Sequence, residues 1–250
     1  MDRQGRWPQK REGPAETDRL DLSRSVFRSL VASLKINIGS RVLDAGCGSG
    51  QLTQRLHAFG ADVLGLDESA KTIRDASQAF PHVAFQVGQF PPIPLGHPDA
   101  EFEVIIVQGL SPYADNLFGR AAFQMTADLL CSLRPNGRFA FLNAIAPGHG
   151  REQDPPSHSI ACYARHLSFF PGVCRVCHLP NGPTTGVVLS KILGQRSPAI
   201  WRLAVLKIPS ERLSAEMWRQ LAEQATAVSP KQCCDQRDSA AGSSDSPRAA

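Results

Sequence analysis

The sequence lacks any long apolar run, and this absence excludes a membrane-spanning helix. The longest aliphatic run is VIIV at Val104–Val107, far short of the roughly 20 apolar residues that such a helix needs. The N-terminal stretch MDRQGRWPQKREGPAETDR is charged and contains no apolar segment of the kind found in secretory signals. We therefore expect a soluble, cytoplasmic protein.

Aromatic residues are also scarce, at 7% of the chain. No Arg/Lys-rich face interleaved with aromatics and no RNA-binding module is visible, so a nucleic-acid partner is not expected. The seven cysteines occur in a chain without an export signal, which favours reduced thiols over a disulfide framework. Residues 41–150 carry more acidic than basic side chains and residues 151–228 the reverse. This division suits a cationic ligand in the first part and an anionic substrate near the second, although an ordinary solvated surface is the more common reason for such a division.

The chain divides into a polar lead at residues 1–17, one domain at residues 18–228 and a tail at residues 229–250. The lead contains Pro8 and Pro14, and the tail has no apolar period, so we expect the lead to be flexible and the tail disordered. With 250 residues and 42% hydrophobic content, the chain can bury a full core as a single α/β domain.

Short apolar runs alternate with helical patterns along the first part of that domain. We expect helices over 20–34, 51–59, 69–80 and 117–133, and strands over 41–46, 62–67, 83–88, 103–108 and 138–145. Pro135 and Gly137 in LRPNGR predict a helix stop and a turn into the last of these strands. The alternation is typical of a parallel sheet with helices on both faces.

The pattern changes beyond Ile145. We expect a helix over 158–169, strands over 173–179, 185–193 and 199–208, and a helix over 213–227 that Ser214 caps at its N-terminus. No internal repeat is visible.

The stretch RVLDAGCGSGQL, at 41–52, places a glycine-rich loop between a strand and a helix. A phosphate-binding P-loop would need Gly-Lys-Ser/Thr, but Gln51 follows Gly50. The dinucleotide fingerprint Gly-x-Gly-x-x-Gly would place its third glycine at Gln51, whereas here it comes one residue earlier, at Gly50. Glycine at every second position from Gly46 lets the backbone pass close beneath a ligand, because no Cβ intervenes.

Two carboxylates accompany this loop. Asp44, at the end of the strand, would be unfavourable beside a pyrophosphate and favourable beside an ammonium group, which indicates a cationic cofactor. Asp67 ends the next strand about 20 residues after Gly46, where such folds deliver a carboxylate to a ribose hydroxyl pair. The sequence therefore predicts a ligand that contains adenosine but no diphosphate.

At this point a family resemblance is apparent. The segments VLDAGCGSG and VLGLDES resemble the first two motifs of class I S-adenosylmethionine-dependent methyltransferases, and FQVGQFPPIPLGHPDAEFEVIIVQG and LLCSLRPNGRFAFLNA continue the likeness over roughly residues 25–145. The resemblance implies an α/β fold, with a Rossmann-like, mostly parallel seven-stranded sheet, helices on both faces and an antiparallel last strand.

The resemblance also implies a set of cofactor-binding residues. It assigns Asp44 and the glycines to the methionine end of S-adenosyl-L-methionine, Asp67 to the ribose, and Glu68 to a place beside the adenine. The complete set is Asp44, Ala45, Gly46, Cys47, Gly48, Gly50, Asp67, Glu68, Gln89, Phe90 and Gln108. Gln89 and Phe90 fall where the family contacts the adenine, and Gln108 ends the fourth strand below the sulfonium.

This sequence departs from the family pattern in places. The family often has Asp where Gln89 stands and commonly Asp where Glu103 stands, and its small-molecule members vary widely at QGLSPY. A glutamine can still hydrogen-bond the adenine amino group through its side-chain oxygen. These departures weaken inferences about affinity more than the assignment to the class.

The implied function is transfer of a methyl group to oxygen, carbon or nitrogen of a small-molecule acceptor by in-line displacement. Residues 18–145 would bind the cofactor, and residues 146–228 would form the acceptor side. Three alternatives stay open: a non-catalytic binding protein, a nucleic-acid methyltransferase and an NAD-dependent oxidoreductase. Ser111-Pro112-Tyr113 lacks the second proline of the nucleic-acid aminomethylating motif, which weakens the second alternative. The oligomeric state and the acceptor cannot be predicted.

No catalytic residue and no metal ligand are assigned. Tyr113 and His149 follow the fourth and fifth strands on the expected acceptor side, where either could accept or orient a proton, although both residue types are common in loops. His158, Cys162 and His166 share a helical face, and Cys174 or Cys177 could complete a zinc site, but the spacing differs from that of common zinc motifs. The sequence CRVCH at Cys174–His178 matches a covalent haem motif that requires export, so we interpret it as coincidence.

Overall fold

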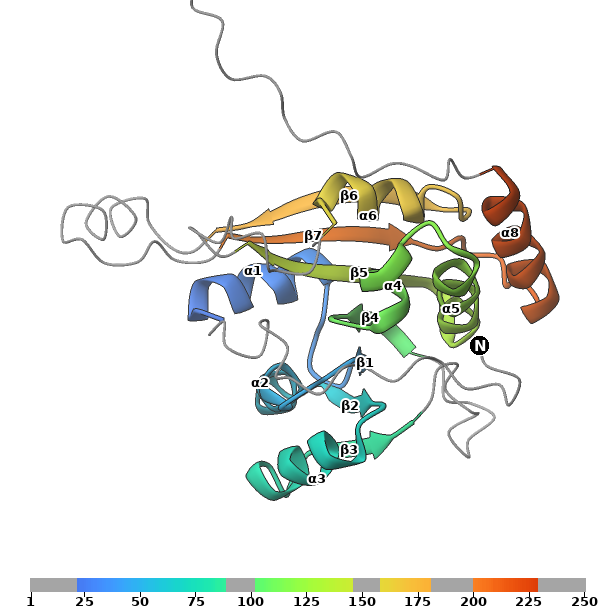
Figure 1. Ribbon diagram of the computed structural model, residues 1–250. Helices are drawn as coiled ribbons and strands as arrows, with labels where there is room; N and C mark the ends of the chain where they lie inside the picture. Colours follow the sequence, from blue (N-terminus) through green and yellow to red (C-terminus); the bar gives the residue numbers. More distant parts are fainter. Residues whose placement is uncertain (1–21, 89–101, 146–157, 181–199, 229–250) are drawn as a thin grey trace, which may run out of the picture.

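The computed structural model describes residues 22–88, 102–145, 158–180 and 200–228. Within these ranges it contains a seven-stranded sheet in the order β3-β2-β1-β4-β5-β7-β6 (Figure 1). The strands are β1 (Arg41–Ala45), β2 (Asp62–Asp67), β3 (Ala84–Val87), β4 (Phe102–Val107), β5 (Leu133–Ile145), β6 (Val173–Leu179) and β7 (Ile200–Lys207). Strands β1 to β5 pair in parallel, and β7 runs antiparallel to both β5 and β6. The predicted mostly parallel, Rossmann-like sheet with an antiparallel last strand is confirmed.

Helices cover both faces of this sheet. One apolar core lies under α1 (Arg24–Leu34) and α2 (Gln51–Phe59). The other lies under α4 (Ser111–Asn116), α5 (Arg120–Cys131), α6 (Ile160–Leu167) and α8 (Ala215–Val228). Helix α3 (Ala70–Ala79) packs beside β2 and β3. Strand alternation divides the side chains between the cores: in β1, Val42 belongs to the first core, whereas Leu43 and Ala45 belong to the second.

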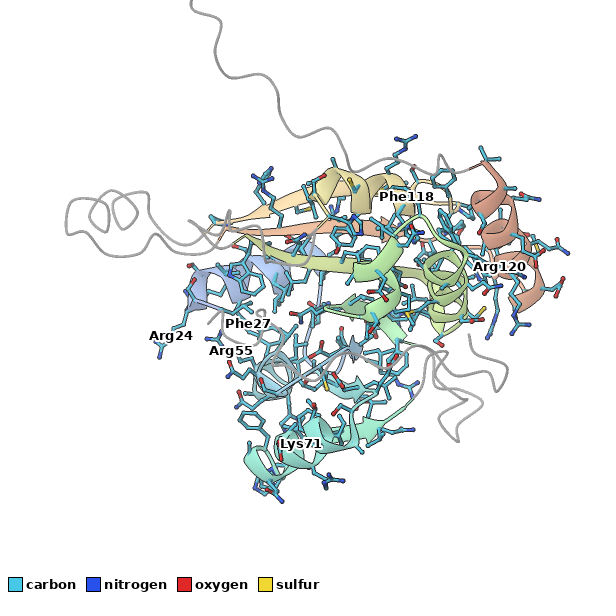
Figure 2. The ribbon with its side chains drawn as sticks, in the orientation of Figure 1. Arg24, Phe27, Arg55, Lys71, Phe118 and Arg120 are labelled. Carbon is cyan, nitrogen blue, oxygen red and sulfur yellow. The ribbon has the colours of Figure 1, made fainter. Side chains whose placement is uncertain are left out.

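Helices α1 and α2 are joined through Phe27 and Arg55 (Figure 2). The Phe27 ring meets the Phe59 ring edge-on at 6.2 Å between centroids. The guanidinium carbon of Arg55 lies 5.7 Å from the centroid of the Phe27 ring, and the same guanidinium donates a hydrogen bond to the carbonyl of Leu22. These contacts hold the first described residues and α1 against α2, the helix that follows the glycine-rich loop.

The helix expected over 117–133 is present as α5, with slightly narrower bounds. A further helix, α4, precedes it and was not predicted. Gly119, which is extended at φ −81°, ψ 159°, caps α5. The side-chain oxygen of Asn116 accepts a hydrogen bond from the amide of Phe118, which satisfies a backbone group between the two helices. Pro112 in the first turn of α4 begins the earlier helix, because its ring favours the start of a helix.

The expected turn at LRPNGR lies inside β5 as an irregularity. Leu133 pairs with Phe102 and Arg138 with Val104, so the register shifts between the two pairs. Asn136 has a positive φ of 63° within this segment. The other predictions mostly agree with the structure: Ser214 caps α8, where its Oγ accepts the amide of Met217 at 3.2 Å. Strands β6 and β7 continue the same sheet as β1 to β5.

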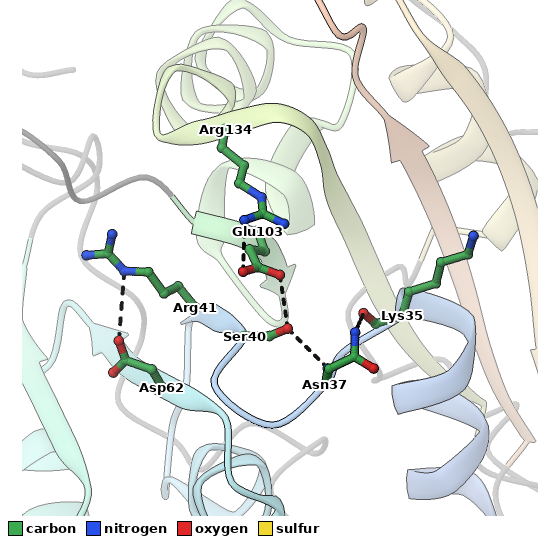
Figure 3. Close-up of polar contacts among 7 residues, drawn as sticks. All are labelled: Lys35, Asn37, Ser40, Arg41, Asp62, Glu103 and Arg134. Carbon is green, nitrogen blue, oxygen red and sulfur yellow. Dashed lines mark hydrogen bonds and ion pairs between the residues drawn. The ribbon is translucent and has the colours of Figure 1, made fainter.

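Glu103 joins three segments at the amino edge of the sheet (Figure 3). One carboxylate oxygen of Glu103 in β4 accepts the hydroxyl of Ser40 at 3.0 Å, and the other lies 3.0 Å from the Arg134 guanidinium in β5. The Ser40 hydroxyl also accepts the amide of Asn37, which lies in the turn before β1. Glu103, where the resemblance leads one to expect Asp, therefore has a structural role at the edge opposite the glycine-rich loop.

Several predictions lie outside the described residues: the lead at 1–17, the strand at 185–193 and the tail at 229–250. The described residues contain no helix long and apolar enough to cross a membrane.

Candidate functional site

The glycine-rich loop lies at the carboxyl edge of the sheet, between the ends of β1, β2 and β4. The amides of Gly46 and Cys47 both donate to the carbonyl of Leu66 in β2, at 2.7 and 3.0 Å. On the other side, the amide of Gln108 donates to the carbonyl of Ala45 at 3.0 Å. The loop is therefore held by backbone bonds to both neighbouring strands, at the position where parallel α/β sheets bind ligands.

Two of the loop glycines are required by packing inside the protein. Gly46 has φ 81°, and a Cβ there would overlap the backbone oxygen of Gln108 and lie 2.9 Å from a methyl carbon of Leu110. Gly50 has φ 78° and precedes α2, and a Cβ there would lie 2.5 Å from the ring of Phe85. The prediction gave close approach of a ligand as the reason for these glycines. The structure adds that the loop must also pass close to β4 and to Phe85 of β3.

Asp44 lies beneath the loop and is fully buried. Its Oδ2 accepts the hydroxyl of Thr53 in α2 at 2.7 Å. The carboxylate therefore faces the core on the α2 side of the sheet, where it joins the strand before the loop to the helix after it. Its assignment to the methionine end of a cofactor stays a prediction.

Asp67 ends β2 next to the loop and keeps 8% of its surface exposed. Its Oδ2 accepts the amide of Gly48 at 3.1 Å, and its Oδ1 accepts the amide of Ser69 at 2.9 Å. A carboxylate offers about four acceptor positions, so these two bonds leave capacity for a pair of hydroxyl donors. The geometry thus fits the ribose contact that the sequence predicted, with the carboxylate already oriented by the loop.

The remaining predicted residues fall into two groups. Ala45, Cys47, Glu68 and Gln108 lie at the same carboxyl edge, with Ala45 and Cys47 buried and Glu68 and Gln108 half-buried. Gln89, Phe90 and His149 lie outside the described residues. The structure therefore brings together the loop, Asp67, Glu68 and Gln108.

Tyr113 does not lie on an open acceptor side, and the prediction that placed it there is wrong. Its side chain is 2% exposed and packs edge-on against Phe141 at 4.8 Å between ring centroids. The Tyr113 hydroxyl lies 3.0 Å from the hydroxyl of Thr126 in α5. Burial raises the pKa of Tyr113 well above its usual range, which opposes a role as a base.

The Thr126 hydroxyl also lies 2.8 Å from Nε2 of His166, which is fully buried in α6. The His166 ring stacks on Phe123 at 4.5 Å between centroids. Burial lowers the pKa of His166 to about 3. His166 is therefore a neutral core residue.

Among the described residues, no group of three or more His, Cys, Asp or Glu side chains is arranged to hold a metal ion. The five cysteines in this part of the chain are free thiols. Cys162 instead lies at the start of α6, where its sulfur accepts a hydrogen bond from the Ser159 hydroxyl at 3.2 Å. Cys174 donates to the carbonyl of Ala164 at 3.5 Å.

His158, which the sequence suggested only as one of several zinc ligands, lies beside α4. Its ring hydrogen-bonds the backbone of Tyr113, and its own carbonyl accepts the side-chain amide of Asn143 in β5 at 3.0 Å. Burial lowers the pKa of His158, partly opposed by the bond to Tyr113. No sequence signal identifies this position, because both partners are distant in the chain.

Comparison with known proteins agrees with this geometry. Residues 42–137 match the family model described as a methyltransferase domain, which covers the glycine-rich loop, Asp67 and Gln108. Residues 42–137 are therefore similar to a methyltransferase domain. They include every described residue of the predicted cofactor set.

The curated relatives match this chain over only part of their own length. The trans-aconitate 2-methyltransferase of Azoarcus sp. is 31% identical over 136 residues, which are 53% of this chain and 48% of that protein. The ribosomal protein L11 methyltransferase of Burkholderia vietnamiensis is 30% identical over 132 residues, 52% of this chain and 38% of that protein. The chain spans about a third to a half of the length of the curated relatives it matches.

A solved structure supports the fold. The phosphoethanolamine N-methyltransferase 1 of Haemonchus contortus superposes with a TM-score of 0.50 at 15% identity, over 84% of this chain and 50% of that one. At this identity the likeness concerns the fold alone.

Proposed function

We propose that this chain uses S-adenosyl-L-methionine to methylate a small-molecule acceptor at oxygen, nitrogen or carbon. The observation that carries the proposal is the position of Asp67, which the loop amide of Gly48 orients while two acceptor positions stay available. Asp44 would repel a pyrophosphate and attract an ammonium group. Asp67 would accept hydrogen bonds from ribose hydroxyls.

Different residues of this chain would contact different parts of the cofactor. Asp67 would accept the ribose hydroxyls, Glu68 would lie beside the adenine, and Gly46 and Gly48 would let the methionine end pass close to the backbone. Gln89 and Phe90 are proposed for the adenine on the sequence alone. When bound, S-adenosyl-L-methionine supplies a methyl group on an already activated sulfonium, so the protein mainly aligns the reactants and excludes water.

We also propose that residues 18–228 act as one domain and that residues 146–228 contribute the acceptor side. The two named relatives act on different acceptors, according to their names, so sequence similarity does not select one for this chain. The lack of an Arg/Lys-rich face interleaved with aromatics in the sequence, and the missing proline of the nucleic-acid motif, favour a small molecule over a nucleic acid. A cytoplasmic location is part of the same proposal.

Isothermal titration of S-adenosylhomocysteine into the full chain tests cofactor binding, with NADH as comparator. We expect micromolar binding of S-adenosylhomocysteine and weaker binding of NADH. Asp67→Ala should weaken the former by about 1 to 3 kcal/mol, because a charge-assisted hydrogen bond is lost. The matched control is Asp75→Ala, which removes the same charge from the exposed face of α3 and should leave the affinity unchanged.

An assay of methyl transfer distinguishes a small-molecule methyltransferase from the alternative functions. The full chain and S-adenosylmethionine with a deuterated methyl group would be incubated separately with a protein-free metabolite extract and with total RNA. Label in small molecules supports the proposal, and label in RNA supports a nucleic-acid methyltransferase. Cofactor binding without label in either pool supports a non-catalytic binding protein, and tighter binding of NADH supports an oxidoreductase.

A further inference from the structure

We propose that a basic edge of this protein docks on a membrane surface that carries anionic lipid headgroups. This edge lies around the end of α1 and the neighbouring ends of β5, β6 and β7, opposite the glycine-rich loop. The proposal concerns the surface that holds the protein and not the reaction, so it does not depend on the proposed methyl transfer. The basic edge consists of five cationic side chains: Lys35, Arg134, Arg138, Arg175 and Lys207.

Three of these cations are neighbours on one face of the sheet. Arg138 of β5 pairs directly with Lys207 of β7, and such antiparallel partners have Cβ atoms about 4.5 to 5.5 Å apart. Arg175 of β6 pairs with Val205, two residues before Lys207, so Arg175 lies diagonally across from Lys207. Residues two positions apart along a strand share a face, and Val205 belongs to the core under α1. The three cations therefore lie together on the face that α1 covers.

The other two cations belong to segments that contact this group. The Arg175 guanidinium donates to the carbonyl of Ser33 near the end of α1, and Lys35 is the C-cap of that helix. Burial lowers the pKa of Arg138, and the neighbouring charges of Arg175 and Arg134 lower it further. The five side chains thus form one continuous region of positive charge.

Carboxylates compensate little of this charge. In the described part of the chain, Glu103 is the one carboxylate that pairs with a member of the basic edge, through Arg134 (Figure 3). Asp62 lies in the same region, but it pairs with Arg41, which is not one of the five. Like charges directly opposite each other on neighbouring strands are destabilising. Anions bound at the basic edge would relieve this repulsion.

Two aliphatic side chains are exposed at the same edge. Ile38 is 82% exposed, and Val173, which pairs with Lys207, is 67% exposed. Ile38 lies in the turn before β1, where the amide of Asn37 donates to the hydroxyl of Ser40 and the amide of Ser40 donates to the carbonyl of Asn37. The turn is therefore held by its own bonds while it presents Ile38 to the solvent.

This combination fits a lipid surface better than other anionic partners. Anionic headgroups attract cations, and aliphatic side chains insert at the boundary between headgroups and acyl chains. Single-stranded nucleic acid is commonly bound by stacking of its bases on aromatic side chains, and none of these seven residues is aromatic. The centre of a protein–protein interface is depleted of charge, whereas here the cations outnumber the aliphatic side chains.

Docking through the basic edge has two consequences. The glycine-rich loop, at the opposite edge of the sheet, would face the aqueous side and stay open to a water-soluble acceptor. The negative surface potential of a membrane is a property of its cytoplasmic leaflet, so this docking agrees with the proposed cytoplasmic location.

Vesicle sedimentation of the full chain tests the proposal. The chain is mixed at fixed ionic strength with vesicles of phosphatidylcholine alone, and with vesicles of phosphatidylcholine and phosphatidylglycerol in equal parts. We expect binding to the mixed vesicles and little binding to phosphatidylcholine alone. Arg175→Gln combined with Lys207→Gln should weaken binding to the mixed vesicles about 10-fold or more, because each cation near an anionic surface contributes about fivefold. Glutamine at position 175 can still donate to the Ser33 carbonyl.

The matched control is Lys71→Gln combined with Arg74→Gln, which removes the same charge from the exposed face of α3 (Figure 2). This variant should bind the mixed vesicles within about twofold of the wild type, because α3 packs beside β2 and β3, away from the basic edge. Equal losses in the two double variants would show that net charge alone attracts the chain, and would overturn the proposal. Cooperative unfolding in urea shows that both variants are folded.

Ile38→Ser tests the aliphatic contact. It should weaken binding to the mixed vesicles about threefold or more, because the inserted side chain is lost. The control is Val228→Ser at the end of α8, an exposed valine on the opposite face of the sheet, which should bind as the wild type does. Wild-type binding by Ile38→Ser would overturn the assignment to a lipid surface. Tighter binding of total RNA than of the mixed vesicles, at equal phosphate concentration, would overturn it in favour of nucleic acid.

Discussion

The hydroxyl of Thr53 in α2 donates a 2.7 Å hydrogen bond to Oδ2 of Asp44 in β1, and both side chains are fully buried. The bond spans the glycine-rich loop, because Asp44 precedes the loop and Thr53 follows it. This buried hydrogen bond therefore joins the residue before the loop to the helix after it. Asp44 has a structural task that exists before any ligand binds.

Thr53→Val should lower the free energy of unfolding by about 1 to 3 kcal/mol, because a buried carboxylate loses a donor while the side-chain volume is kept. Urea denaturation measures the change. Thr72→Val is the matched control on α3, outside the two apolar cores, and should change stability by less than about 0.5 kcal/mol. Equal effects of the two substitutions would show that Asp44 does not depend on the Thr53 hydroxyl.

Gly46→Ala should be far more destabilising than Gly39→Ala, although the two glycines have nearly the same φ, 81° and 78°. A Cβ at Gly39 would meet nothing within 4 Å, whereas one at Gly46 would overlap the Gln108 carbonyl. Gly39→Ala should cost only the backbone strain of about 1 to 2 kcal/mol, and Gly46→Ala about 1 to 3 kcal/mol more. Melting temperatures of the two variants compare them, and similar values would contradict the steric argument.

The sequence could predict the parts of this fold that depend on local patterns. The glycine-rich loop, the strand that delivers Asp67 and the cap at Ser214 each follow from residues within a few positions of one another. The seven-stranded sheet with an antiparallel last strand came from the family resemblance. These predictions succeeded because neighbouring residues decide turns, caps and strand ends.

Features that depend on distant contacts could not be predicted. Tyr113 was expected on the acceptor side because it follows the fourth strand, yet it packs against Phe141 and Thr126 in the core. Helix α4 was not predicted, whereas α5 was expected within residues 117–133. The position of His158 depends on Asn143 and Tyr113, and neither partner can be identified from the neighbouring sequence.

Glu103→Asp should destabilise the protein, although Asp is the residue expected from the family. Loss of one methylene prevents the carboxylate from reaching Ser40 and Arg134 together, and we expect a cost of about 0.5 to 1.5 kcal/mol. The control is Asp62→Asn, which removes the exposed ion pair with Arg41 in the same region (Figure 3) and should cost almost nothing. Urea denaturation at equal salt compares them. A cost for Asp62→Asn as large as that for Glu103→Asp would contradict the role given to Glu103.

The buried neutral ring of His166 should make stability fall in mild acid. Its pKa in the folded protein is about 3, well below the ordinary value of 6.5, so the unfolded chain takes up the proton first as the pH falls. The contribution is constant above pH 6.5 and is lost between that value and pH 3. This amounts to about 2 kcal/mol between pH 7 and pH 5, at about 1.4 kcal/mol for each pH unit below 6.5.

His166→Gln isolates this contribution, because a glutamine can still bond the Thr126 hydroxyl but has no proton to gain in this range. The free energy of unfolding in urea, measured at pH 5, 6 and 7, should fall less steeply in His166→Gln than in the wild type. His57→Gln, at an exposed position on α2, should keep the wild-type slope, since its histidine is not buried. If His166→Gln shows the wild-type slope, the acid sensitivity comes from carboxylates and the ring is not held neutral by its burial.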